Sequence, residues 1–300
     1  MTFNDTALML GNQGRPFSFS KLDVAKTCGF KYTKKYIERV KPTDLVDGSA
    51  ALVGTIVHSI LEDGVKVFLG STTVPTPAEV LGVVDRLSSY HIGRSPVTSL
   101  EKEKVALLLG NVAILLNRFL KAIIEHKAKV YLEAPAAIDQ YLNPMSFDDP
   151  KSFFRGKIDM VVVYPNGAVE VIDHKTSRVF DGQTSASLLQ KYQDQLRAYE
   201  ILVYHGLRKK ILHEHGIEIK AVRTGLAYVV IADLIKTPKP TTLDVLSKET
   251  TEWFVDWVNK LSDRAQEGSV NRASHCKWCE YKTACGSRVG KGRKIKAVAL

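Results

Sequence analysis

Two apolar stretches joined by a tight turn constrain the fold of this chain more than any other feature. Residues 153–164 and 168–175 both have strand character, and Pro165-Asn166-Gly167 lies between them. Such a segment is typical of the turn that joins two antiparallel strands. The sequence therefore predicts a β-hairpin whose strands lie side by side.

The predicted hairpin carries charged residues among apolar ones. Asp159 lies in the first strand, and Asp173 and Lys175 end the second. Side chains two residues apart on a strand point to the same face, so Asp173 and Lys175 should project together, within reach of Asp159. Mg²⁺ or Mn²⁺ would satisfy the two carboxylates and could supply a bound water that attacks a phosphodiester. A surface salt bridge of Lys175 is the alternative, but the surrounding pattern favours the metal site.

The rest of the chain predicts an α/β fold with a mixed central sheet and flanking helices. We interpret residues 1–300 as one domain with its core at about 50–235. The first sixteen residues lack periodicity and are expected to be a loose arm, and a short helix capped by Ser20 should follow. Further strands are expected at 130–138 and 221–232, and further helices after Cys28 and at 51–69, 79–89, 100–126, 186–205 and 243–266.

The charge of the chain favours a polyanionic partner. Its formal net charge is +10 and its pI is about 9.3. Basic residues concentrate near the end, where 287–300 forms a basic tail. Nonspecific affinity for nucleic acid comes mainly from neutralised phosphates, so DNA is a fitting partner, although charge can also serve solubility alone. No apolar run is long enough to span a membrane and no signal-peptide pattern is present, so we expect a cytoplasmic protein without a membrane partner.

The hairpin with Asp159, Asp173 and Lys175 resembles the active-site motif of the PD-(D/E)XK nuclease superfamily, in particular of its RecB-like exonuclease branch. The stretch from Gly54 to His58 is similar to the helical histidine motif of that branch. Gln195 and Tyr199 match its Gln-x-x-x-Tyr motif, and Glu133 lies where the branch often has an acidic residue. Each has a simpler explanation, because a histidine on an apolar helix can be a core residue and Tyr199 can be ordinary packing.

The resemblance implies a restriction-endonuclease-like core and assigns roles to these positions. His58, Asp159 and Asp173 would hold Mg²⁺ or Mn²⁺, with Glu133 as a further candidate. The implied catalytic residues are Asp159, Asp173, Lys175, Gln195 and Tyr199.

Four cysteines form a second candidate metal site. Cys276, Cys279 and Cys285 have C-x2-C-x5-C spacing, whereas Cys28 stands alone near the other end of the chain. Cysteines of a cytosolic protein are rarely paired in disulfides, so a shared tetrathiolate site is expected to join Cys28 to 270–286. One cysteine at the start and three at the end resemble the iron–sulfur subgroup that includes CRISPR-associated exonucleases. That resemblance favours a [4Fe–4S] cluster; Zn²⁺ or four unliganded thiols are the alternatives.

Together these features predict a metal-dependent DNA exonuclease that acts in recombination, repair or replication. Basic and aromatic residues alternate around Phe30-Lys31-Tyr32 and Lys277-Trp278, a pattern that suits single-stranded ends. The chain has no Walker motif, so helicase activity would belong to a partner protein. The alternatives are an endonuclease or end-processing enzyme, an inactive DNA-binding or assembly subunit with the same fold, and a structural zinc protein.

Overall fold

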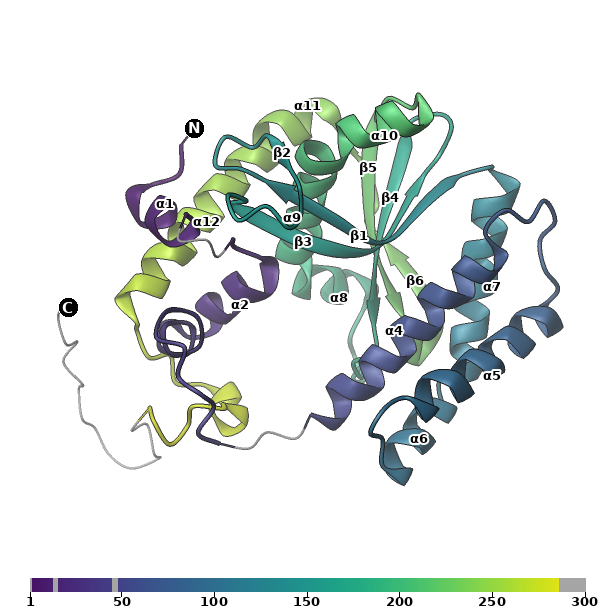
Figure 1. The fold of residues 1–300 in the computed structure, drawn as a ribbon, viewed down its shortest axis with the longest axis horizontal. Coiled ribbons are helices and arrows are strands. Elements are labelled where there is room, and N and C mark those ends of the chain that lie inside the picture. Colours follow the sequence, from purple (N-terminus) through teal and green to yellow (C-terminus); the bar gives the residue numbers. More distant parts are fainter. Residues whose placement is uncertain (1, 13–15, 45–47, 286–300) are drawn as a thin grey trace.

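A mixed β-sheet forms the centre of the molecule (Figure 1). The structure is a computed structural model that describes residues 2–12, 16–44 and 48–285. Its strands are β1 (Lys129–Ile138), β2 (Pro144–Met145), β3 (Phe154–Val163), β4 (Ala168–Lys175), β5 (Ala221–Tyr228), β6 (Asp233–Lys236) and β7 (Thr241–Thr242). The strand order is β2-β1-β3-β4-β5-β6, and β7 also pairs with β5. The expected α/β class with a mixed sheet is confirmed, whereas the basic tail at 287–300 lies outside the described residues.

The predicted hairpin is present. Strands β3 and β4 are antiparallel, and β4 continues into the sheet by parallel pairing with β5. Gly167 in the connecting turn has a φ of 87°, which favours glycine. A Cβ atom there would also lie 2.4 Å from the carbonyl oxygen of Glu218, so this turn needs glycine for two reasons.

Helices cover both faces of the sheet (Figure 1). Helices α4, α5 and α7 bury their apolar residues against Met160, Val162 and Ile172, and helices α2, α9 and α12 bury theirs against Val161 and Val171. The α-helices are α1 (Asp5–Gly11), α2 (Phe19–Thr27), α3 (Gly29–Tyr32), α4 (Ser49–Phe68), α5 (Pro77–Gly93), α6 (Ser99–Ala106), α7 (Leu109–Glu125), α8 (Ser185–Lys191), α9 (Gln193–Ile201), α10 (Arg208–His215), α11 (Leu243–Val245) and α12 (Thr251–Glu267). Short π or 3₁₀ segments are η1 (Thr33–Ile37), η2 (Leu202–Leu207), η3 (Val229–Ile231), η4 (Leu246–Thr250) and η5 (Ser274–Trp278).

The start of the chain differs from the prediction of a loose arm. Residues 5–11 form α1, because Asn4 caps the helix and Ala7 and Leu10 are buried. The backbone nitrogen of Asn4 also donates to Asn259 of α12 at 2.9 Å. The next helix begins two residues early, with Ser18 rather than Ser20 as its cap. Tertiary contact with a distant helix thus orders a segment that has little periodicity of its own.

The helix predicted over 100–126 is two helices, α6 and α7, bent by 43°. At the bend Leu107 is 76% exposed, and Lys104 of α6 donates to Ser49 at the start of α4 at 3.3 Å. The helix predicted over 186–205 likewise divides, at Tyr192. Among the described residues no single helix is long and apolar enough to cross a membrane; α6 and α7 pass that test of length and composition only when combined.

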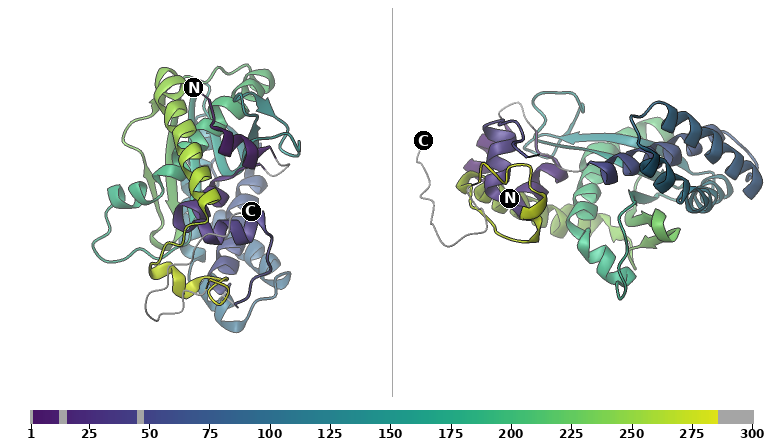
Figure 2. Two further views of the ribbon diagram at one scale, coloured as in Figure 1. Left: turned by 90° about the vertical axis from the view of Figure 1, so that its left-hand side faces the viewer. Right: turned by 90° about the horizontal axis from the view of Figure 1, so that it is seen from below.

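The two ends of the described chain pack together (Figures 1 and 2). The backbone nitrogen of Phe30 donates to the carbonyl oxygen of Ser269 at 3.2 Å. The hydroxyl of Tyr281 donates to the carbonyl oxygen of Val40 at 2.9 Å. Gly29 lies so close to the end of α12 that a Cβ atom would be 2.4 Å from the carbonyl oxygen of Arg264. Glycine at this position therefore lets α3 and α12 meet.

A buried carboxyl on α9 makes stability depend on pH. Glu200 is 5% exposed; burial raises its pKa from 4.5 to about 7, opposed by a hydrogen bond from Thr241 and by Arg197. Because the folded state holds this proton more tightly, the contribution of Glu200 to stability is fully present below pH 4.5 and is lost as the pH rises to 7. We expect Glu200→Gln to remove up to about 3 kcal/mol of this loss. Urea unfolding at pH 5 and pH 8 measures it, and an unchanged pH dependence would contradict the assignment.

Candidate active site

Asp159 lies where strands β1 and β3 change their regular alternation. Leu132 and Ala134 are two residues apart but pack in opposite core clusters, and the residue between them, Glu133, has a φ of 45°. On β3, Ile158 and Val161 share one cluster although they are three residues apart. The β3–β4 ladder ends at Met160–Ile172. Asp159 therefore lies at a break in the regular alternation of β3, just beyond the last residue pair of the β3–β4 ladder.

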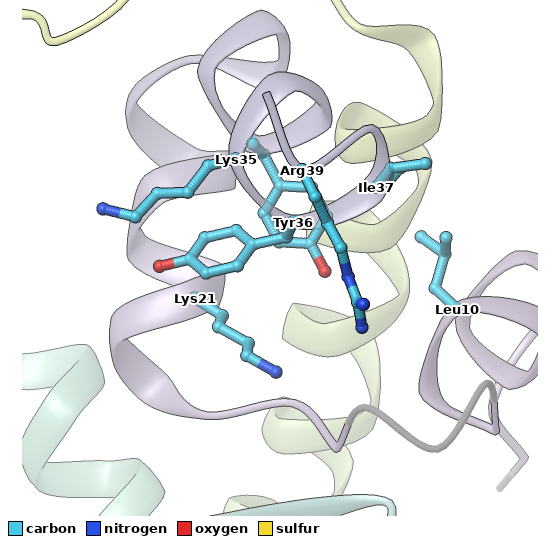
Figure 3. A pocket seen from close by; sticks show the side chains of 7 residues that line it. Leu10, Lys21, Lys35, Tyr36, Ile37 and Arg39 are labelled. Carbon is cyan, nitrogen blue, oxygen red and sulfur yellow. The ribbon is translucent and has the colours of Figure 1, made fainter. Parts of the chain in front are cut away.

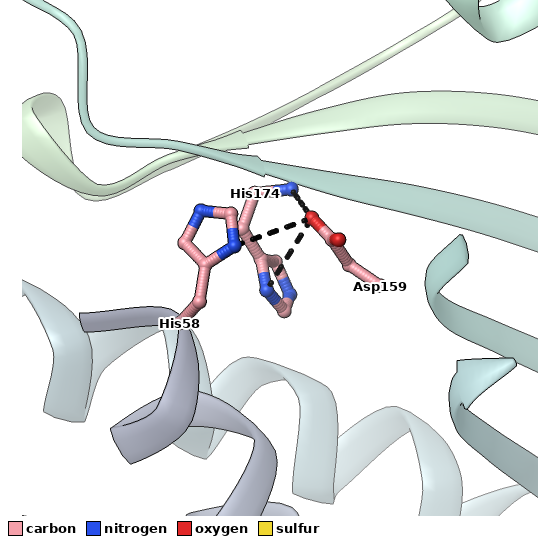
Figure 4. Close-up of side chains that lie close together, drawn as sticks. All are labelled: His58, Asp159 and His174. Carbon is pink, nitrogen blue, oxygen red and sulfur yellow. Dashed lines mark hydrogen bonds and ion pairs between the residues drawn. The ribbon is translucent and has the colours of Figure 1, made fainter. Parts of the chain in front are cut away.

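The carboxylate of Asp159 faces two histidines (Figure 4). Its Oδ2 accepts a hydrogen bond from the backbone nitrogen of His174 at 2.7 Å. The same oxygen lies 3.7 Å from Nδ1 of His58 on α4 and 3.9 Å from Nδ1 of His174 on β4. One ligand atom from each of the three residues lies within 4.8 Å of the other two. Two imidazole nitrogens and a carboxylate oxygen are a donor set that can hold a divalent cation.

His174 is the member of this group that the sequence reasoning missed. Its side chain is 4% exposed, and it stacks on Phe119 and meets His58 edge-on. Burial lowers the pKa of His174 to about 4, so its imidazole is neutral and can donate a lone pair. The alternation of side chains along β4 was the available signal: because Asp173 and Lys175 share one face, His174 between them must point to the opposite face. The structure shows that α4 covers that face.

Asp173 and Lys175 project together, as the alternation predicts. Nζ of Lys175 lies 2.5 Å from Oδ2 of Asp173 and donates to Oε1 of Gln195 at 3.0 Å. The Nε2 group of Gln195 donates to Oδ1 of Asp173 at 2.8 Å and to the hydroxyl of Tyr199 at 3.0 Å. The predicted residues Asp173, Lys175, Gln195 and Tyr199 thus form one network, in which the amide of Gln195 fixes both the carboxylate and the ammonium group.

The two groups of side chains influence each other electrostatically. Burial raises the pKa of Asp173 to about 7, Lys175 opposes this, and the charge of Asp159 adds to it. Burial lowers the pKa of His58; Asp159 opposes the shift and Lys175 adds to it. A carboxylate–imidazole group beside an ammonium group can bind a cation and also neutralise charge on a phosphate.

Glu133 lies beside this site and outside the group of three. Its nearest ion pair is with Lys157 at 3.9 Å, and its side chain is 40% exposed. Burial raises the pKa of Glu133, and the charges of Asp159 and Glu62 raise it further. It therefore adds negative potential near Asp159.

All four cysteines line one cavity, together with Phe30 and His275. Cys28 and Cys285 are buried, and Cys276 and Cys279 are half-buried. Burial raises the pKa of the Cys279 thiol, and the nearby Cys28 and Cys285 also raise it. Within the described part of the chain, no three of these sulphur atoms lie within 4.8 Å of one another. The structure thus brings Cys28 and the three C-terminal cysteines to one cavity, but it does not show their sulphur atoms arranged as a metal site.

Comparison with known proteins assigns the family. The model of the PD-(D/E)XK nuclease superfamily matches residues 16–286. No curated protein matches the chain. The crystal structure of SSO0001 is 16% identical, covers 79% of this chain and 98% of its own, and has a TM-score of 0.35, a likeness from which we draw nothing. With the family model spanning nearly the whole sequence, the chain belongs to the PD-(D/E)XK nuclease superfamily.

Proposed function

We propose that this protein is a divalent-metal-dependent DNA exonuclease of the RecB-like branch. The observation that carries the proposal is the placement of two complementary groups on neighbouring strands. Asp159 faces two imidazoles, at 3.7 Å and 3.9 Å, while Lys175 is fixed beside Asp173 by Gln195. Nuclease chemistry needs both a cation site and a positioned ammonium group.

The cation would be held by Asp159 and His58, with His174 or Asp173 completing the protein ligands. His58 and Asp159 are partly exposed, whereas Nε2 of His174 is buried without a hydrogen-bond partner among the described residues. A bound divalent cation would supply a water of lowered pKa and stabilise charge on the phosphate. Imidazole ligands suit Mn²⁺ better than they suit Mg²⁺, so we expect Mn²⁺ to support activity at lower concentration.

The side chains of the second group would orient the reactants. Lys175 can donate to the attacking water or to a phosphate oxygen while Gln195 holds its ammonium in place. The hydroxyl of Tyr199, 7% exposed, accepts a hydrogen bond from Gln195 and limits the rotation of that amide. Asp173 is the counter-ion of Lys175 and fixes the position of its ammonium group.

The substrate would be a DNA strand entering from an end, during recombination, repair or replication. Trp278 beside the cysteine cavity is 64% exposed and lies under the ammonium of Lys277, an arrangement that suits stacking of unpaired bases. Tyr281, in contrast, is buried and shields the cavity. A helicase or recombination partner would supply the single strand.

The cysteine cavity would hold a [4Fe–4S] cluster that joins the two chain ends. The donor set fits, since four thiols from Cys28, Cys276, Cys279 and Cys285 line one space. Structural zinc sites usually use two short cysteine pairs, whereas here Cys28 stands alone, and this arrangement favours the cluster over a zinc ion.

A digestion of labelled DNA tests the proposed function. We expect linear single strands, labelled at either end, to be degraded with Mn²⁺ or Mg²⁺ and left intact with EDTA. A circular single strand of the same sequence should resist, because it has no end. Cleavage of the circle would replace the exonuclease by an endonuclease. A folded protein that binds both DNAs and cuts neither with any divalent metal would favour the inactive DNA-binding subunit.

A further inference from the structure

A cavity of about 200 Å³ lies among the N-terminal helices (Figure 3), and none of the three residues of the metal-binding group lines it. Lys21 of α2 and Lys35 and Arg39 from the η1 region line it together with Tyr36. The ammonium groups of Lys21 and Lys35 lie 5.7 Å and 5.8 Å from the centre of the Tyr36 ring. Two lysines beside the ring of Tyr36, with Arg39 in the same lining, form a pocket that could bind a phosphate and an adjoining base.

Three cationic side chains line the pocket, and its lining residues include no carboxylate. Nζ of Lys35 donates to Glu280 at 2.8 Å, and Lys31 shares the same carboxylate at 3.6 Å. Nζ of Lys21 donates to the carbonyl oxygen of Pro16 at 2.8 Å. An ammonium group has three hydrogens, so the hydrogen bond of Lys35 to Glu280 leaves Lys35 with further donors.

Arg39 is the feature that points most directly to a ligand. Among the described residues it makes no hydrogen bond or ion pair, and its residue is exposed. Its φ is 55°, in the left-handed region that is costly for a residue with a side chain. The turn that ends η1 accounts for this φ, because the backbone nitrogen of Val40 donates to the carbonyl oxygen of Lys34 at 2.9 Å; the same turn places the guanidinium at the cavity with its donors available to a ligand.

The pocket is connected to the active site through α2. Lys26 of this helix pairs with Asp194 of α9 at 2.8 Å, next to Gln195. Burial raises the pKa of Asp23 on the same helix, and Lys26, followed by Lys175, opposes that shift. The charge of the candidate catalytic lysine thus reaches α2, and Lys21 lies two residues from Asp23 on the same helix.

We propose that Lys21, Lys35, Tyr36 and Arg39 form a phosphate-binding pocket that grips the DNA strand outside the active site. The inference rests on the proposed function for its choice of ligand, because a phosphate could also come from a free anion. Arg39 would contact a phosphate through its guanidinium fork, and Tyr36 would offer its ring to the neighbouring base. Contacts with phosphates do not depend on the base sequence, so this pocket would hold a DNA strand of any sequence during repeated cleavage.

Arg39→Gly is the decisive variant, because glycine accepts a positive φ and removes the charge. Binding of a fluorescent 20-nucleotide oligothymidine to the full chain is measured by anisotropy in EDTA, where no cleavage occurs. We expect the Kd to rise about three- to tenfold and the slope of log K against log salt to fall by about 0.7. The melting temperature should stay the same or rise, which separates lost contact from lost folding. Arg39→Lys should retain most of the salt dependence.

Lys102→Ala on α6 is the matched control, since Lys102 is also an exposed cation and lies on a helix of the opposite face. It should leave Kd unchanged within about twofold. An equal Kd for Arg39→Gly and the parent protein would overturn the proposal. If inorganic phosphate raises the melting temperature of the parent but not of Arg39→Gly while DNA binding stays equal, the pocket takes a free anion and the strand contact is wrong. Binding through Arg39 without any cleavage would overturn the proposed function and leave this pocket standing.

Discussion

Replacing Lys175 with alanine is expected to lower metal-dependent DNA cleavage by about 10²–10³-fold or more, with the fold retained. The ammonium of Lys175 is 2.5 Å from Asp173 and is held by Gln195, so its position is set before any substrate arrives. Without it, charge on the phosphate loses its nearest cationic partner. Rates of mononucleotide release at saturating Mn²⁺ measure the effect.

The expected result depends on Asp173 tolerating the loss of its partner. Removing one member of a buried ion pair leaves the other charge uncompensated. Burial already raises the pKa of Asp173 to about 7, so the carboxyl can take up a proton and limit the damage to stability. Lys175→Met, which retains much of the side-chain volume, separates the charge from the packing.

Lys157→Ala is the matched control for Lys175→Ala. Lys157 lies on the adjacent strand β3, is 55% exposed and has Glu133 as its ion-pair partner. Its loss should change the cleavage rate less than about threefold, since exposed pairs contribute little. If Lys175→Ala cleaves as fast as the parent protein, the assignment of the active site is wrong.

Local patterns predicted the hairpin and its contents because each depends on residues close in sequence. The turn at Gly167 and the alternation along β4 set the strand pairing and bring Asp173 beside Lys175. One helical turn sets Gln195 beside Tyr199. These features need no knowledge of the rest of the molecule.

What the sequence could not supply depends on contacts between distant segments. Helix α1 is ordered by α12 through contacts such as that of Asn4 with Asn259, which periodicity cannot reveal. His174 joins His58 because α4 packs on that face of β4, and the irregularity at Glu133 that releases Asp159 has no signature in a strand pattern. The bend between α6 and α7 likewise accompanies contacts with another segment, such as that of Lys104 with Ser49 of α4.

The cysteine site combines both situations. The spacing of Cys276, Cys279 and Cys285, together with the solitary Cys28, predicted from the sequence that the four thiols share a site. The structure explains why glycine follows Cys28, since any Cβ atom at Gly29 would meet the backbone of Arg264. The identity of the bound group depends on chemistry that a spacing alone leaves open.

Cys28→Ala is expected to reduce bound iron and to lower the free energy of unfolding by several kcal/mol. Cys28 is buried and lies about 250 residues from the other three cysteines, so a shared cluster closes a very long loop. Anaerobically purified parent protein should be brown with about four iron atoms per chain, and Cys28→Ala should be paler and unfold at lower urea.

Chelation supplies the control that a further cysteine cannot, because the chain has only four. After iron is removed, the parent protein and Cys28→Ala should unfold at nearly the same urea concentration, and any small remaining difference measures the packing of the thiol itself. Colourless protein with one zinc per chain would replace the cluster by a zinc ion. Metal-free protein with equal stability of both forms would mean that Cys28 and its three partners are unliganded thiols, and that Gly29 and the contacts of Phe30 and Tyr281 hold the chain ends together without a metal.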